Sequence, residues 1–157
     1  MKKLFSLIML FFAVAVLGDT LPVNKWRHNY QTGNFKASYR KYPLMLEAVS
    51  APQTRKIWGR LVQKVTLTPG KKYEFTVRYK LNENFKGQAS FWLRSSKGAD
   101  KNNNLWLLDR AQGENKGMEK TMSGILTANT ETYTVNLNIR FGTGLMEVYD
   151  VQITEVQ

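Results

Sequence analysis

The sequence predicts an all-β protein, an antiparallel β-sandwich of the jelly-roll type. Apolar and polar residues alternate with a period of two through several segments. Turn-forming Gly, Pro and Asn residues separate these segments at short intervals. No long segment shows the 3.6-residue periodicity of an amphipathic helix. Short alternating strands with this punctuation are typical of a sandwich.

Seven strands are predicted between residue 41 and residue 156. They cover residues 41–49, 57–67, 72–81, 88–96, 105–108, 133–141 and 145–156. A Pro-Gly turn joins the second of these to the third, and a Gly-Thr-Gly turn precedes the last. Polar segments 82–87, 96–104 and 110–120 are predicted loops. The residues expected to point inward are Tyr73, Phe75, Val77, Tyr79, Leu81, Tyr133, Val135, Leu137, Ile139 and Phe141.

The first 18 residues have the layout of a secretory signal peptide. Lys2 and Lys3 precede an unbroken apolar run, and small residues follow it, so cleavage is expected near Asp19. An uncleaved membrane anchor is the alternative, although the run is short for one. No later segment is apolar enough to span a bilayer. Residues 19–157 are therefore predicted to form one domain that is secreted or periplasmic.

Charge narrows the range of partners. The chain carries a formal charge of +11, and losing Lys2 and Lys3 with the signal peptide leaves +9. An excess of this sign favours polyanions, such as acidic glycans, nucleic acid or anionic membrane surfaces. The alternative is that the charge only keeps the protein soluble. The chain has no cysteine, so packing rather than disulfides must stabilise it.

Three segments have a recognisable pattern: LVQKVTLTPGKKYEFTVRYK (61–80), VNLNIRFGTGLMEVYDVQIT (135–154) and TGNFKAS (32–38). The first resembles the signature of carbohydrate-binding modules of families four and nine, the second resembles the last two strands of those modules, and the third resembles their amino-terminal segment. The resemblance implies a galactose-binding-like jelly roll that binds a polysaccharide or oligosaccharide chain on its concave sheet. It also implies ligand contacts at Arg140 and aromatic platforms near Trp58 and Trp106.

Aromatic and guanidinium groups in the polar phase of the strands are the candidate binding groups. An aromatic face covers the C–H side of a sugar ring, whereas guanidinium and amide groups bond to its hydroxyls. Trp92 shares its phase with Arg94 and Trp58 shares its phase with Arg60, so both rings are expected outside the core. The predicted ligand-binding residues are Trp58, Arg60, Trp92, Arg94, Trp106, Asn138 and Arg140.

Alternatives to this interpretation remain open. Tryptophans are often core residues, and Trp106 shares its phase with Leu108. Trp26, near the predicted mature start, is expected to be a packing residue. Further basic residues, Lys64, Arg78 and Lys80, also lie in the polar phase of their strands, and about half of the basic set is expected to reach one groove. An acidic glycan suits that basic set better than a neutral one.

The resemblance also raises the question of a structural calcium ion. Modules of this kind often hold one with an amino-terminal Glu and a late Asp. The late residue corresponds to Asp150, but Lys36 stands where the Glu is usual. A calcium ion at Asp150 is thus a candidate, and no other cofactor is expected.

Catalysis is not predicted. His28 is the single histidine, there is no cysteine, and the acidic residues form no paired motif for glycoside hydrolysis. The chain also lacks a recognised nucleic-acid-binding signature and a phosphate-binding loop. The sequence therefore favours a polysaccharide-binding protein. The alternatives are a structural or adhesive surface protein that binds another protein, and a small enzyme that cleaves glycans.

Overall fold

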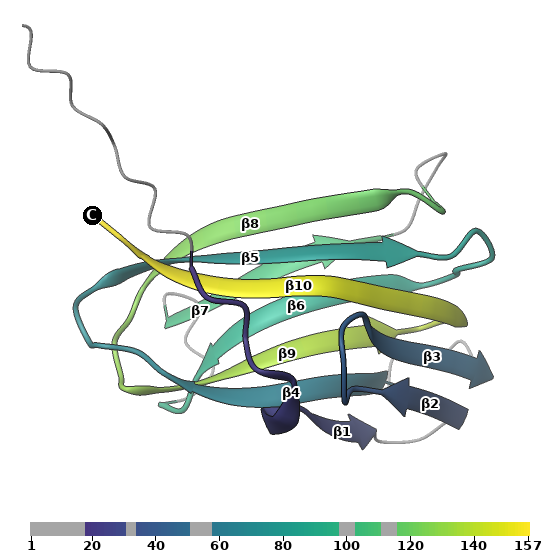
Figure 1. Ribbon diagram of the computed structural model, residues 1–157, viewed down its shortest axis with the longest axis horizontal. Helices are drawn as coiled ribbons and strands as arrows, with labels where there is room; N and C mark the ends of the chain where they lie inside the picture. Colours follow the sequence, from purple (N-terminus) through teal and green to yellow (C-terminus); the bar gives the residue numbers. More distant parts are fainter. Residues whose placement is uncertain (1–17, 31–33, 51–57, 98–102, 111–115) are drawn as a thin grey trace, which may run out of the picture.

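Two five-stranded antiparallel sheets pack face to face in the computed structural model, which describes residues 18–30, 34–50, 58–97, 103–110 and 116–157 (Figure 1). Sheet I has the order β1-β4-β9-β6-β7, with bounds Arg27–Tyr30, Trp58–Thr66, Thr132–Arg140, Gln88–Ser95 and Asn104–Asp109. Sheet II has the order β2-β3-β10-β5-β8, with bounds Asn34–Ser38, Leu44–Ser50, Gly144–Val156, Lys72–Leu81 and Glu119–Thr127. A short 3-10 helix, Val23–Lys25, precedes β1. The all-β sandwich predicted from the sequence is confirmed.

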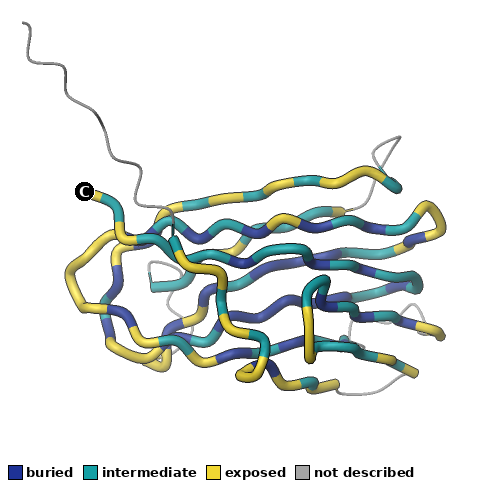
Figure 2. The backbone as a smooth tube through the Cα atoms, viewed as in Figure 1, coloured by how far each residue is buried: buried dark blue, intermediate teal, exposed yellow. Residues whose placement is uncertain are grey.

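The core lies between the sheets because each strand turns every second residue inward. On β5 the inward residues Phe75, Val77 and Tyr79 are fully buried, and on β9 Val135, Leu137 and Ile139 are too. Buried positions accordingly alternate along β5 in Figure 2, whereas the edge strand β8 has few of them. Trp26 is 2% exposed, so it is the packing residue that the sequence predicted.

Three strands, β1, β2 and β8, were not predicted from the sequence. β1 and β2 are short, and β8 combines polar residues with a glycine where a bulky inward residue would be expected. That glycine, Gly124, lies against the side chains of Leu105 and Leu107 on β7, leaving no room for a Cβ without a shift of these side chains. A glycine interrupts the apolar pattern of β8 because leucine side chains of β7, in the opposite sheet, occupy the space that a larger residue would need.

The expectation that Phe141 points into the core is wrong. β9 ends at Arg140, and Phe141 adopts a left-handed backbone with φ of 59°. The ring lies 4.9 Å from the guanidinium carbon of Arg140. The chain turns here because Gly142 approaches the main chain of Lys86 so closely that no side chain would fit.

The predicted signal peptide falls almost wholly outside the described residues, so it stays a prediction. In the part of the chain that the structure describes, no helix has the length and apolar character needed to cross a membrane.

Candidate functional site

All the predicted binding residues lie on the outer face of sheet I. Their register shows this: Trp58 is opposite Arg140, and Arg60 is opposite Asn138 across the β4–β9 pair. Trp92 on β6 is flanked by Asn136 of β9 and by Trp106 of β7. Arg94 is two residues further along β6, in the same outward phase. Period-two alternation, together with the pairing of β4, β9, β6 and β7, therefore brings these side chains onto a single surface.

Two tryptophans form an aromatic pair at the β6–β7 side of this face. The rings of Trp92 and Trp106 meet edge to face with their centroids 4.9 Å apart. Trp106 is 55% exposed, whereas Trp92 is partly buried and its Nε1 has no hydrogen-bond partner among the described residues. The pair therefore presents indole surface to solvent, mainly through Trp106, while the indole N–H of Trp92 is buried.

Arginines also lie over aromatic rings of the face. The guanidinium carbon of Arg60 lies 4.3 Å from the centroid of the Trp58 ring. That of Arg140 lies 5.7 Å from the centroid of the Trp92 ring. These separations are in the range of cation–π contacts, so indoles and guanidinium groups hold one another in place across the face.

The two asparagines of β9 are less accessible than their phase indicates. Asn138 is 3% exposed, and its Nδ2 donates to the main-chain carbonyls of Ser90 and Asn136 at 3.1 and 3.4 Å. Asn136 is 2% exposed, and its Nδ2 donates to the Thr134 carbonyl at 3.0 Å. Neighbouring side chains therefore cover the centre of the face, and a ligand role for Asn138 remains a prediction.

A cavity of about 310 Å³ opens on the outer face between β4 and β6. Arg60 and Val62 line it from β4, Arg94 from β6, and Thr134 and Asn136 from β9 beneath. Burial lowers the pKa of the Arg60 guanidinium, and the positive charge of Arg94 lowers it further. Both effects disfavour the cation, and no carboxylate of the described residues lines this cavity.

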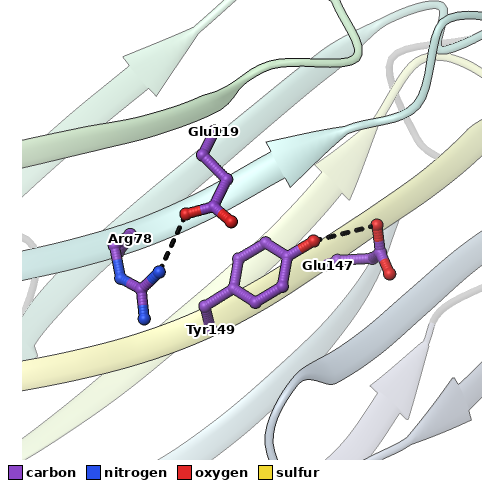
Figure 3. A network of polar contacts seen from close by, with 4 residues as sticks. All are labelled: Arg78, Glu119, Glu147 and Tyr149. Carbon is purple, nitrogen blue, oxygen red and sulfur yellow. Dashed lines mark hydrogen bonds and ion pairs between the residues drawn. The ribbon is translucent and has the colours of Figure 1, made fainter.

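The outer face of sheet II differs in its charges. Arg78 on β5 forms an ion pair with Glu119 on β8, with a distance of 2.8 Å between Nη1 and Oε2. Its guanidinium also lies 5.4 Å from the ring of Tyr149, whose hydroxyl donates to Glu147 (Figure 3). Lys80 occupies the same outer face, opposite both Glu119 and Glu147. Lys64 thus belongs to one sheet, whereas Arg78 and Lys80 belong to the other.

A polar cluster at the β7–β8 edge was not predicted from the sequence. The Tyr79 hydroxyl donates to Oδ2 of Asp109 at 2.6 Å, and Lys120 Nζ donates to the same oxygen at 2.9 Å. The cluster borders an open cavity of about 660 Å³. Burial raises the pKa of Tyr79, and the hydrogen bond and charge of Asp109 raise it further. The tyrosine therefore stays protonated and donates a proton in a hydrogen bond rather than acting as a base.

The residues around Asp150 do not fit a calcium site well. Calcium takes six to eight oxygen ligands. Oδ1 of Asp150 accepts a hydrogen bond from Thr20, and Oδ2 accepts one from Gln152, each at 2.6 Å. Among the described residues no group of three or more His, Cys, Asp or Glu side chains could hold a metal ion. Calcium at Asp150 stays a prediction.

The chain folds as a sandwich with an aromatic and polar outer sheet face, and its family model is of the carbohydrate-binding-module class. A family model described as BppA domain 1, of the family four and nine type, matches residues 23–155, and the chain belongs to this family. The resemblance stated from the sequence is thereby confirmed. No curated protein matches the chain in sequence.

Solved structures share the fold. The xylan-binding module CBM15 superposes with a TM-score of 0.60 at 12% identity, covering 87% of this chain and 94% of that one. TmCBM61, solved with β-1,4-galactotriose, gives 0.56 at 12% identity, covering 85% and 90%. The active domain of tailspike protein 4 from bacteriophage CBA120 gives 0.60 at 12% identity, covering 85% of this chain but only 20% of that chain. Family and fold together support a carbohydrate-binding role, which is consistent with a protein that binds rather than cleaves.

Proposed function

We propose that this protein binds a polysaccharide chain non-covalently along the outer face of sheet I. The supporting observation is that Trp58, Trp92 and Trp106 share this face with Arg60, Arg94 and Arg140. Indoles cover the C–H side of sugar rings while guanidinium groups donate to hydroxyls or acidic substituents. The pair formed by Trp92 and Trp106 is the main platform in this proposal, because Trp106 is largely exposed.

We propose further that an acidic polysaccharide is preferred over a neutral one. Sheet I has Arg27, Arg60, Lys64, Arg94 and Arg140 in its outward phase, and its strands place no Asp or Glu in that phase. A surface of one sign attracts a polyanion over a distance and favours it on contact.

The site of action in this proposal is outside the cytoplasm, in the periplasm or the surrounding medium. The signal-peptide layout of residues 1–18 supports export, and carbohydrate-binding modules are typically extracellular.

A glycan array probed with the full chain tests the function. We expect selective binding to a class of polysaccharide, and we expect the Trp92→Ala and Arg140→Ala variants to bind about tenfold or more weakly while their urea-unfolding midpoints stay near wild type. Absence of glycan selectivity, together with retention of a protein ligand, would point instead to an adhesive protein. Release of reducing ends or unsaturated products over time would show an enzyme.

A further inference from the structure

The cavity between β4 and β6 has the composition of an anion site. It lies between the guanidinium-bearing side chains of Arg60 and Arg94, which stand on the two strands that flank β9. Thr134 and Ser96 add hydroxyl groups, and Val62 supplies an apolar wall. A volume of about 310 Å³ is near the lower end of the range for small-ligand pockets, which suits one sugar residue or its acidic group.

The two arginines of this cavity have no acidic partner in the part of the chain that the structure describes. Neither Arg60 nor Arg94 has an ion-pair partner among the described residues, whereas Arg78 on sheet II is paired with Glu119. The Nε of Arg60 is buried without a hydrogen-bond partner in the same part of the chain. A buried donor without an acceptor is costly.

The position of Arg60 is fixed by its neighbour. Its guanidinium lies against the Trp58 ring at 4.3 Å, which limits the orientations that the planar group can take. Trp92 lies on the cavity-lining strand β6, two residues before Arg94. It is opposite Asn136, which also lines the cavity. The cavity therefore adjoins the aromatic rings on which sugar residues are proposed to stack.

We propose that the cavity between Arg60 and Arg94 is an anion subsite, which receives one carboxylate or sulfate group carried by the bound polysaccharide. The inference rests on the proposed function, because it assumes that a glycan follows the face. Two guanidinium groups fit either anion, since each presents paired N–H donors to two oxygens. An anion bound between them also removes the repulsion of two like charges.

Matched pairs of charged and neutral polysaccharides test carboxylate and sulfate groups separately. The full chain is titrated by calorimetry with polygalacturonate and its methyl ester, and with dextran sulfate and dextran. We expect a charged member to bind about tenfold or more tightly than its neutral counterpart, and Arg60→Gln and Arg94→Gln each to remove most of that difference. Arg27→Gln is the control, because Arg27 lies on the same face and carries the same charge but does not line the cavity.

A second measurement does not depend on finding the right glycan. The Nε–H resonances of Arg60 and Arg94 are followed by NMR while sodium sulfate replaces sodium chloride at constant ionic strength. A saturable shift in both resonances supports the subsite. In Arg94→Gln the shift of the Arg60 resonance should disappear, and in Arg27→Gln both shifts should remain.

The possible failures are distinguishable. If neutral and charged chains bind equally and sulfate shifts neither resonance, the subsite is wrong while the proposed function stands. If Arg27→Gln weakens charged chains as much as the cavity variants do, the attraction is diffuse and the subsite is again wrong. If sulfate binds at Arg60 and Arg94 but no polysaccharide binds, the anion site exists and both the proposed function and the glycan as its occupant are lost.

Discussion

Arg60 and Trp58 stack on one another at the outer face of β4, with the guanidinium carbon 4.3 Å from the ring centroid. The two residues are separated by a single position, Gly59, so their side chains emerge on the same side of the strand. The stack means that one side of the Trp58 indole is already occupied. A sugar that uses this tryptophan must approach its other side or displace the arginine.

This stack should be measurable as an energetic coupling. In a double-mutant cycle of Trp58→Ala and Arg60→Ala, we expect the free energies of unfolding to be non-additive by about 0.5–1 kcal/mol, the range of exposed cation–π contacts. Urea denaturation of the four proteins gives the value. A control cycle of Trp58→Ala and Lys64→Ala should be additive within about 0.5 kcal/mol. Equal coupling in both cycles would rule out a specific stack.

The exposed indole of Trp106 should matter for binding more than for folding. Because Trp106 is 55% exposed, Trp106→Ala is expected to change the free energy of unfolding by less than about 1 kcal/mol. Loss of the apolar surface that a sugar covers should weaken polysaccharide binding by about tenfold. Isothermal titration with the preferred glycan measures this. Ile125→Ala, at a similarly exposed residue of sheet II, should leave affinity unchanged.

Salt should weaken binding of an acidic polysaccharide. The basic residues on the outer face of sheet I interact with a polyanion through charges that salt screens. Between about 0.05 and 0.5 M sodium chloride we expect affinity to fall at least about fivefold, because the screening length shortens across this range. Affinity that stays level over the series would show that hydroxyl contacts and stacking dominate instead.

Stability should decrease at acid pH through His28. This residue of β1 lies opposite Leu61 in the inward phase, and its Nε2 is buried without a partner among the described residues. Burial lowers the pKa of His28 below its usual 6.5, so the folded state favours the neutral ring. The unfolded chain then takes up a proton first, and stability is retained above pH 6.5 and lost as the pH falls towards the folded-state pKa.

The His28→Asn variant isolates this contribution, because the chain has one histidine. Urea unfolding is compared at about pH 8 and about pH 5. Wild type should lose more stability than the variant between these two values. An identical loss in both proteins would assign the acid sensitivity to carboxylates.

Gly59 should not tolerate a larger residue. It points inward from β4, and a Cβ at this position would collide with the ring of Phe35 on β2. Gly59→Ala is therefore expected to destabilise the fold by about 1–3 kcal/mol, as overpacking of a core does. Urea unfolding measures the loss, and adding Phe35→Leu should recover part of it. If Gly59→Ala alone is neutral, the two sheets are not in contact at this point.

Much of the site could be predicted from the sequence, because period-two alternation determines on which side of a strand a side chain lies. Trp58, Arg60, Trp92 and Arg94 could be placed outside the core from their phase alone, and the register then brought β4, β9 and β6 together. The same rule failed for Phe141, since a turn ended its strand one residue earlier than the alternation implied.

Other features depend on partners that are far apart in the chain. The near-complete burial of Asn138 reflects side chains on adjacent strands, and the pairing of Arg78 with Glu119 joins residues 41 positions apart. The cavity beside Arg60 likewise requires β6 to lie next to β9. None of these can be read from local alternation, which reports one strand at a time.

The two sides of the sandwich hold their charges differently, and this gives the molecule an orientation. Basic groups on sheet I lack acidic neighbours in their outward phase, while Arg78 and Lys71 elsewhere are matched by Glu119 and Glu155. Such a particle has a permanent charge moment across its thickness. Near a negatively charged wall or gel it should rotate so that its indole-bearing side arrives first, before any specific contact is made.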